Sequence, residues 1–330
     1  DLLKEAIITK LERDSGLVYE KNQILASCGA KHSFYNLAQV LWQAGDEVII
    51  PAPYWVSFPE IVTLSGARPL IIHTGAEQDF KITAEQIENA VTPNTRAIVI
   101  NSPSNPTGSA YEKDELEKLA ECALRHGLLI ISDEIYEQIV FDGFHHTSIA
   151  SISKEVQKQC VVINGVSKSY AMTGWRIGYI AAGDPEIVKQ VSKLQGQSTS
   201  NPCATSQAAS IEALVGSLDE VRAMVREFEK RRNIIVERLT QIPGVSCRKP
   251  TGSFYSFPDF SGIYGKKDTN GKVLKGSLDL SDYLLSTKKV AIVPGIAFGA
   301  DAHARLAFAM SLEKIEAGTH RIKEAIENLQ

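Results

Sequence analysis

The chain has 330 residues, 44% of them hydrophobic, and a formal net charge of −4 at pH 7. This length and composition support a large buried core and two lobes. The weak negative charge excludes a general attraction to nucleic acid or anionic membranes, so we expect small-molecule substrates and neither a nucleic-acid nor a membrane partner.

From Lys21 onward, strand-like runs alternate with helix-like stretches, which indicates an α/β fold with a mostly parallel sheet between helices. We expect strands at 23–27, 47–50, 70–72, 97–101 and 128–131. We expect helices ending near 43, around 58, beginning at 83 and over 114–126. Thr83 and Gln86 have the spacing of a capping box, which marks a helix start.

The pattern changes after Gly183. Residues 219–239 carry apolar side chains at helical spacing without an interrupting strand, which predicts a long connecting helix. We then expect strands at 253–257, ending at 294–295, and at 305–309, followed by a final amphipathic helix. The sequence therefore predicts a large domain over 1–230 and a smaller α+β domain over 231–330.

The cysteines are odd in number and lack the close pairs typical of zinc sites or disulfide frameworks: Cys28, Cys122, Cys160, Cys203 and Cys247. This pattern favours reduced thiols in a cytoplasmic protein. No apolar run approaches the roughly 20 residues of a membrane span, and no secretory signal follows Asp1.

The stretch 160–179 is the centre of the predicted site. An apolar run at 160–163 reads as a buried strand, and the turn after it carries Lys168, with Arg176 eight residues on. Ligands of open α/β sheets bind at the carboxyl ends of the strands. A lysine beside apolar groups and another cation is a nucleophile suited to a Schiff base, whereas an isolated lysine is more often a solvated surface residue.

Polar residues follow other predicted strands. Asp133 could keep the ring nitrogen of a pyridine aldehyde cofactor protonated, or it could cap a helix. Asn105 and Tyr136 could hydrogen-bond a phenolic oxygen, or they could be a turn residue and a packed aromatic.

The segment Gly29, Ala30 and Lys31 leads into a helix, and its free amides could seat a phosphate, to which Arg176 would add a forked donor. Trp55 could stack on a ring, or it could belong to the core. Arg305 lies within an apolar strand, where its charge is costly unless it pairs with an anion such as a substrate carboxylate.

Other kinds of site find little support. The chain contains no H-E-x-x-H, C-x-x-C or G-x-S-x-G motif, and the adjacent His145 and His146 lack the spacing of metal ligands, so we expect no metal. The run 265–272 is only superficially similar to a P-loop, and we interpret it as a solvated hairpin.

Five segments together resemble the fold-type-I aminotransferases that depend on pyridoxal 5′-phosphate (PLP), especially the bacterial branch of the aspartate aminotransferase family. They are 101–108 (NSPSNPTG), 132–136 (SDEIY), 167–179 (SKSYAMTGWRIGY), 250–255 (PTGSFY) and 293–295 (VPG). The resemblance implies a seven-stranded, mostly parallel sheet between helices and a smaller carboxyl-terminal α+β domain.

The resemblance also implies the roles of the site residues. Lys168 would hold PLP as a Schiff base and, once the substrate amine displaces it, would move a proton. Asp133 would pair with the ring nitrogen. Asn105 and Tyr136 would bond the ring hydroxyl, and Trp55 would stack on the ring. The phosphate would be bound by Gly29, Ala30, Lys31 and Arg176. The substrate would be bound by Arg305, Lys31, Trp55 and Asn105.

Two departures from the family pattern follow from the alignment of the motifs. Gly165 stands where many relatives carry a phosphate-binding serine, so the role does not pass to Ser167 by analogy. An amino-terminal arm, a substrate-covering glycine and a tyrosine lent to the neighbouring subunit would all lie upstream of Asp1.

The function implied by the resemblance is a ping-pong aminotransferase, built as a homodimer with shared active sites. Its substrates would be aspartate or glutamate and a 2-oxo acid, or a related dicarboxylic oxo acid such as prephenate. Two alternatives are a PLP-dependent lyase or decarboxylase of the same fold and an aminotransferase-like sensor domain of a transcription regulator.

Overall fold

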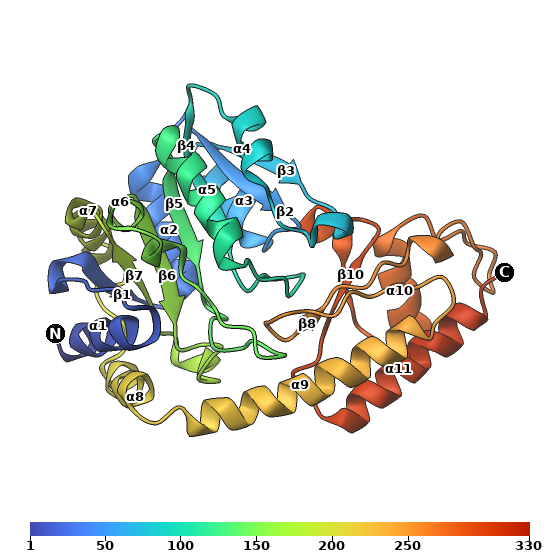
Figure 1. The fold of residues 1–330 in the computed structure, drawn as a ribbon. Helices are drawn as coiled ribbons and strands as arrows, with labels where there is room; N and C mark the ends of the chain where they lie inside the picture. The colour runs from blue at the N-terminus through green and yellow to red at the C-terminus, as the bar shows by residue number, and fades with distance from the viewer.

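The computed structural model describes residues 1–330 and contains two sheets joined by a long helix (Figure 1). The larger sheet has seven strands in the order β1-β7-β6-β5-β4-β2-β3. Only β7 runs antiparallel to its neighbours. The predicted seven-stranded, mostly parallel sheet is therefore confirmed. Its strands are β1 (Ile24–Ser27), β2 (Glu47–Ala52), β3 (Arg68–His73), β4 (Thr95–Asn101), β5 (Leu129–Asp133), β6 (Cys160–Gly165) and β7 (Gly178–Ala182).

Helices cover both faces of this sheet because successive strand residues point to opposite sides. Ile130 packs into the core on one face and Ile131 into the core on the other. The first face is covered by α1 (Leu2–Ser15), α4 (Ala84–Ala90), α5 (Lys113–Arg125), α6 (Lys154–Lys158) and α8 (Ala204–Val215). The second face is covered by α2 (Ala30–Leu41), α3 (Ser57–Leu64) and α7 (Pro185–Gly196).

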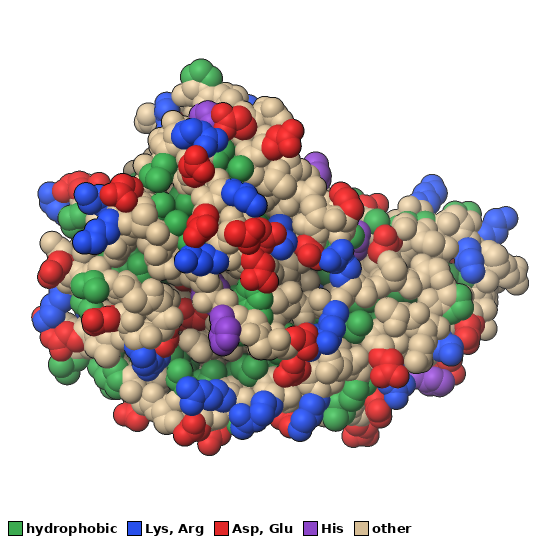
Figure 2. Space-filling model, in the orientation of Figure 1, with side chains coloured by type: hydrophobic (Ala, Val, Ile, Leu, Met, Phe, Trp, Pro, Cys, Tyr) green, Lys and Arg blue, Asp and Glu red, His purple; other side chains and the backbone are tan.

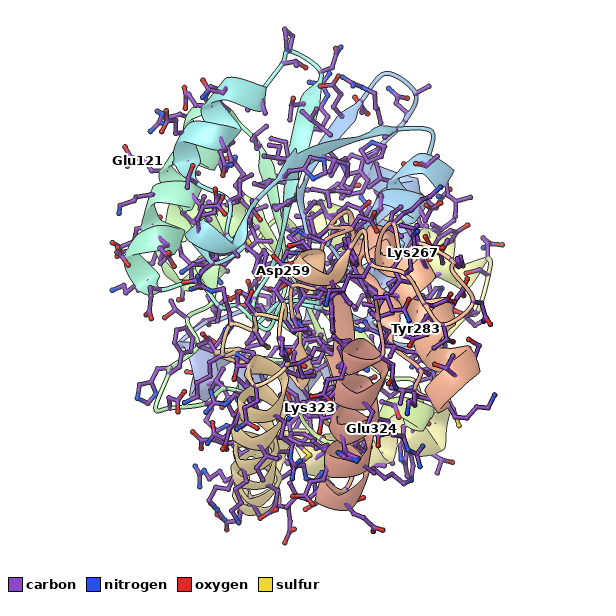
Figure 3. All side chains as sticks on the ribbon, turned by 90° about the vertical axis from the view of Figure 1, so that its right-hand side faces the viewer. Glu121, Asp259, Lys267, Tyr283, Lys323 and Glu324 are labelled. Atoms are coloured by element: carbon purple, nitrogen blue, oxygen red, sulfur yellow. The ribbon has the colours of Figure 1, made fainter.

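The smaller sheet is antiparallel, in the order β8-β10-β9. Its elements are β8 (Tyr255–Ser256), α10 (Ser277–Lys288), β9 (Val293–Pro294), β10 (Ala304–Ala307) and α11 (Leu312–Glu327). The Tyr283 hydroxyl donates to the Ala325 carbonyl at 2.9 Å and so fastens α10 to α11 (Figure 3). Strand β8 is shorter than predicted, because Ser253 has a left-handed backbone (φ 60°) that breaks the extended run.

The connecting helix α9 (Asp219–Thr240) confirms the long helix predicted from residue spacing. It passes through position 230, so the proposed boundary between the two domains falls inside a helix. The loop after β5 also joins the two parts, because Tyr136, Ile139 and Phe141 pack with α9, α10 and α11 in one apolar cluster.

The surface mixes charges of both signs over the face drawn in Figure 2. None of the helices combines the length and the apolar character that crossing a membrane requires.

The predicted hairpin at 265–272 is confirmed by an antiparallel bridge between Lys267 and Val273.

Candidate active site

The parallel strands β4, β5 and β6 end at one edge of the larger sheet, where a cavity of about 330 Å³ opens. Nine of the ten predicted site residues line it: Ala30, Lys31, Trp55, Asn105, Asp133, Tyr136, Lys168, Arg176 and Arg305. The tenth, Gly29, precedes α2 and lies against the Arg176 guanidinium. Residues from both sheets thus meet in a single cavity.

Asp133 is the last residue of β5 and is only 6% exposed. Its Oδ1 accepts a hydrogen bond from the Ile135 amide at 3.2 Å. Burial raises the pKa of this carboxyl group to about 7. The alternative role as a helix N-cap is wrong, because residues 135–138 form turns and no helix begins there. A cationic ligand atom in the cavity would therefore favour the ionised form of Asp133.

The neighbouring carboxylate, Glu134, is almost fully buried and has its own partners. Its Oε1 accepts from the Ser132 hydroxyl at 2.8 Å and from the Ser148 hydroxyl at 2.6 Å, and His146 Nε2 lies 3.4 Å from Oε2. Burial opposes ionisation of Glu134, but these groups together keep its pKa below the usual value. The negative charge of Glu134 in turn contributes to the raised pKa of Asp133.

Lys168 lies in the turn after β6 and is partly buried, with Nζ 5.5 Å from the ring centroid of Phe254. Burial lowers the pKa of its amine, the positive charges of Arg305 and Arg176 lower it further, and Asp133 opposes this shift. A lowered pKa increases the share of neutral amine, which is the nucleophilic form.

The start of α2 and the Arg176 side chain form an anion seat. The Ala30 and Lys31 amides lie in the first turn of α2 and have no acceptor inside the helix. Arg176 donates to the carbonyls of Thr173 at 3.0 Å and Cys28 at 3.3 Å, which hold its guanidinium beside this turn. A Cβ added to Gly29, whose φ is 95°, would overlap that guanidinium. Glycine suits this position because of its positive φ and because it lets the guanidinium lie close to the first turn of α2.

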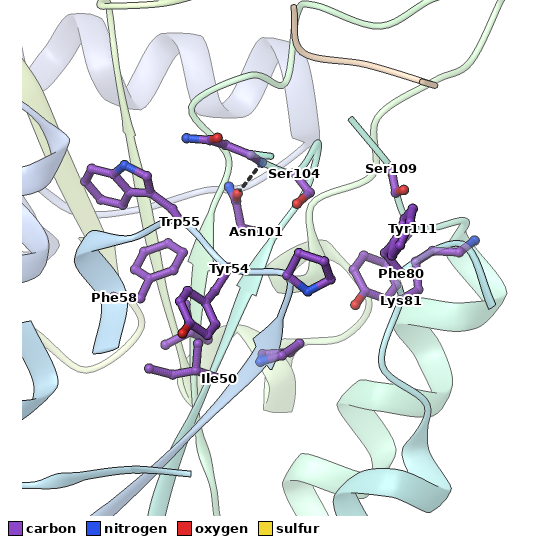
Figure 4. A pocket seen from close by; sticks show the side chains of 14 residues that line it. Ile50, Tyr54, Trp55, Phe58, Phe80, Lys81, Asn101, Ser104, Ser109 and Tyr111 are labelled. Carbon is purple, nitrogen blue, oxygen red and sulfur yellow. Dashed lines mark hydrogen bonds between the residues drawn. The ribbon is translucent and has the colours of Figure 1, made fainter. Parts of the chain in front are cut away.

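Trp55 forms one wall of the cavity. Phe58 packs edge-on against it at 5.2 Å between ring centroids, and Lys31 Nζ lies 5.1 Å from the indole centroid. A second, much smaller cavity of about 30 Å³ lies between Trp55 and Tyr111 (Figure 4). This volume holds one or two water molecules and no cofactor. Asn101, drawn there, accepts from the Asn105 amide at 2.8 Å and so fixes the turn after β4 (Figure 4).

Arg305 reaches the cavity from β10. Its Nη1 donates to Asn105 Oδ1 at 2.8 Å, and its guanidinium stacks 4.4 Å from the ring centroid of Tyr255. No carboxylate pairs with Arg305, so an anionic substrate group could take that place. The Tyr136 hydroxyl donates to the Tyr255 hydroxyl at 3.3 Å, and Tyr136 packs on Phe254, so it is a packed aromatic residue whose hydroxyl lies at the cavity.

The cavity also contains residues that the sequence analysis did not assign: Asn101, Ile135, Ser167, Thr173 and Tyr255. Asn101 ends β4 as Asp133 ends β5, and the same reasoning could have found it. Tyr255 lies in the recognised PTGSFY segment. Ser167 and Thr173 lie in the recognised segment 167–179.

Gly165, the first departure from the family pattern, has a steric explanation. A Cβ at this position would lie 2.6 Å from the Ile177 carbonyl oxygen and 2.9 Å from Gly178 Cα. The close pairing of β6 with β7 therefore leaves no room for a serine at this position. Ser167 and Thr173 line the cavity.

Comparison with known proteins identifies the class that this fold and site define. The family model for aminotransferase class I and II matches residues 1–322, and the chain belongs to this family. It is 48% identical to the aspartate aminotransferase of Geobacillus stearothermophilus, covering 98% of this chain and 81% of that protein. It is 43% identical to a probable aspartate/prephenate aminotransferase of Rickettsia typhi, covering 99% and 82%. The crystal structure of the aspartate aminotransferase from Rhizobium meliloti superposes with a TM-score of 0.97 at 41% identity, over 100% of this chain and 82% of that one.

Proposed function

We propose that this chain transfers the amino group of aspartate or glutamate to a 2-oxo acid, using PLP in a ping-pong cycle. The observation that carries the proposal is the meeting of Lys168 and Asp133 in one cavity, with Arg305 at its rim. The aspartate aminotransferases named above support the choice of acidic substrates.

The residues of the cavity fit PLP. When bound, this cofactor supplies an aldehyde that condenses with amines and an electron-withdrawing ring that stabilises negative charge. Lys168 would attach it, Asp133 would hold a proton on the ring nitrogen, and Asn105 and Tyr136 would bond the ring hydroxyl. Trp55 would cover the ring. The amides of α2 and Arg176 would bind the phosphate, because Gly29 lets the guanidinium lie close to the start of that helix.

The chemistry required of this chain is proton transfer and orientation. Lys168 Nζ, once free, would accept the proton from the substrate Cα and deliver it to the cofactor. Arg305 would hold the α-carboxylate through a forked pair, and Lys31 would attract the distal carboxylate. These two contacts would present the Cα–H bond to the lysine.

Borohydride reduction of the PLP-loaded enzyme, followed by peptide mapping, tests the attachment site. We expect one label per chain, on Lys168. A label on Lys31 instead would contradict the proposal. Absorbance titration of the bound cofactor with single amino acids then defines the substrate, and elimination products in place of a 2-oxo acid would exclude amino transfer.

Replacing Arg305 by lysine should weaken aspartate binding. Lysine keeps the charge but loses the forked geometry, so we expect kcat/KM for aspartate to fall roughly 10- to 100-fold, mostly through KM. Steady-state kinetics give the measurement. Arg248, which bonds the Ala76 carbonyl and Asp79 away from the cavity, supplies the control as Arg248→Lys. Equal losses in both variants would count against the assignment.

A homodimer and a cytoplasmic location complete the proposal. Apolar side chains lie exposed beside the cavity, among them Tyr35, Val56 and Leu64. They border a broad hollow that Lys31 and Arg176 also line, which supports contact with a second copy of the chain at the phosphate end. All five cysteines are free thiols, as suits a reducing compartment.

A further inference from the structure

Far from the cofactor cavity, α4 and α5 bring together a carboxylate, a thiol and an imidazole. Cys122 and His126 are four residues apart on α5, so they share one face of that helix. Glu88 faces them from α4. Their ligand atoms all lie within 4.8 Å of one another. The neighbouring Glu121 points outward from α5 (Figure 3) and takes no part.

The distances between the ligand atoms are close to those of a metal site. Cys122 Sγ lies 3.4 Å from Glu88 Oε2, and His126 Nε2 lies 2.9 Å from Glu88 Oε1. Around a tetrahedral zinc ion with usual bond lengths, neighbouring ligand atoms are about 3.4–3.6 Å apart. Small side-chain rotations would close the difference.

The His126 ring is not satisfied by hydrogen bonding. Its Nε2 is shielded from solvent, yet its alignment with Glu88 does not meet the geometry of a hydrogen bond. A cation bound between the imidazole and the carboxylate would give both groups a partner. Thiolate, imidazole and carboxylate are the three ligand types that zinc takes in proteins.

We propose that Glu88, Cys122 and His126 bind one zinc ion that links α4 to α5, with its fourth position open to water. The Glu88 and His126 side chains are 46% and 28% exposed, which gives the ion a path from solvent. Binding replaces the proton on Cys122: the sulfur keeps its electron pair and bonds to the metal, and the proton leaves to the buffer.

Two groups compete with zinc at this site: the proton on the Cys122 thiol and the Arg125 guanidinium. Zinc must displace the proton of the Cys122 thiol, so it should bind more tightly as the pH rises. Arg125 Nη2 also lies 3.0 Å from Glu88 Oε2. Its side chain is 51% exposed and can turn into solvent.

A second cluster, formed by Glu134, Glu137 and His146, has similar spacing but different surroundings. The Lys10 ammonium is enclosed there and pairs with Glu137, and the two serine hydroxyls hold Glu134. These partners already neutralise or bond the carboxylates and cannot withdraw, so this cluster is a structural ion-pair network.

The test uses the PLP-loaded enzyme after treatment with a chelator. Calorimetric titration with Zn²⁺ should show one site per chain that Cys122→Ser or Glu88→Gln weakens at least 100-fold. Titration with Co²⁺ should give the charge-transfer absorption of a cobalt–thiolate bond, which Cys122→Ser abolishes. Repeating the zinc titration in buffers of different ionisation enthalpy should show about one proton released per ion.

Matched variants distinguish zinc binding at this site from nonspecific zinc binding elsewhere on the chain. Cys203→Ser removes an exposed thiol elsewhere and should change nothing. Arg125→Ala removes the competing cation and should tighten zinc binding several-fold. Glu88→Gln is a surface change that leaves the core intact, so it decides the matter even if Cys122→Ser fails to fold. Equal zinc affinity in the wild type and Glu88→Gln, or a wild type without the cobalt–thiolate band, would overturn the proposal.

Discussion

Lys168→Ala is expected to lower kcat for amino transfer from aspartate by about 10⁴-fold or more. The Lys168 side chain has two proposed roles: it holds the cofactor, and it accepts the proton from the substrate Cα. Water is a poor substitute for the second, because it is neither positioned nor matched in pKa to the task. Stopped-flow measurement of the half-reaction with aspartate isolates this step from product release.

Lys31→Ala provides the control, because both lysines line the same cavity. Lys31 would act on binding alone, so its loss should raise KM for aspartate with a far smaller change in kcat. The cofactor should remain bound to Lys168→Ala through the phosphate seat and Asp133, as equilibrium dialysis can show. Comparable kcat in the two variants would refute the role given to Lys168.

Asp133→Asn is expected to reduce kcat roughly 10²- to 10³-fold, the usual effect of removing one preorganised charge. An amide cannot stabilise a protonated ring nitrogen, so the ring would accept negative charge less readily. Asp133→Glu keeps the carboxylate and should retain more activity than the asparagine variant. A pH profile of the bound-cofactor absorbance would show whether the ring environment, and not only the fold, has changed.

The same substitution should stabilise the cofactor-free protein. The Asp133 carboxyl has a pKa of about 7 in the folded chain against an ordinary value of 3.8. Between these values the folded state binds more protons than the unfolded state, so stability falls as the pH rises and levels off above about 7. A difference of one pKa unit corresponds to about 1.4 kcal/mol. Ionisation of Asp133 therefore lowers the free energy of unfolding by about 4 kcal/mol at pH 8 and by about 2 kcal/mol at pH 5.

Urea unfolding of the cofactor-free wild type and Asp133→Asn at these two pH values measures the effect. We expect the asparagine variant to be more stable at both, with the larger margin at pH 8. Asparagine still offers an oxygen to the Ile135 amide, so the local hydrogen bond is preserved. If the difference in unfolding free energy between the variant and the wild type does not grow with pH, burial does not destabilise the ionised form of Asp133.

The strands and helices were largely predictable because their signals are local. The capping box at Thr83 is present, with Gln86 donating its amide to the Thr83 hydroxyl. The amphipathic helix predicted at 114–126 appears as α5. Strand β7 was missed, because its five residues follow a glycine-rich motif and carry only a brief apolar run. Its antiparallel direction has no local signal at all.

The site residues were predicted from their positions at strand ends and from the family resemblance, and all of them except Gly29 line the cavity. Tyr255 and Thr173 lie in two of the recognised segments but were given no role, because only the folded structure shows that they line the cavity. The Glu88, Cys122 and His126 cluster escaped for a related reason: a search for closely spaced cysteines cannot detect ligands contributed by two helices.

The order of residues along the chain established which side chains end the strands, where helices begin, and that glycine stands at 29. It could not establish which residues come into contact in the folded chain. Arg305 and Asn105 are 200 positions apart yet hydrogen-bonded. Nor could it show that Asp133 and Glu134, adjacent in sequence, have pKa values shifted in opposite directions. Those shifts arise from lost hydration and from nearby charges, and both depend on distances that exist only after the two sheets have packed together.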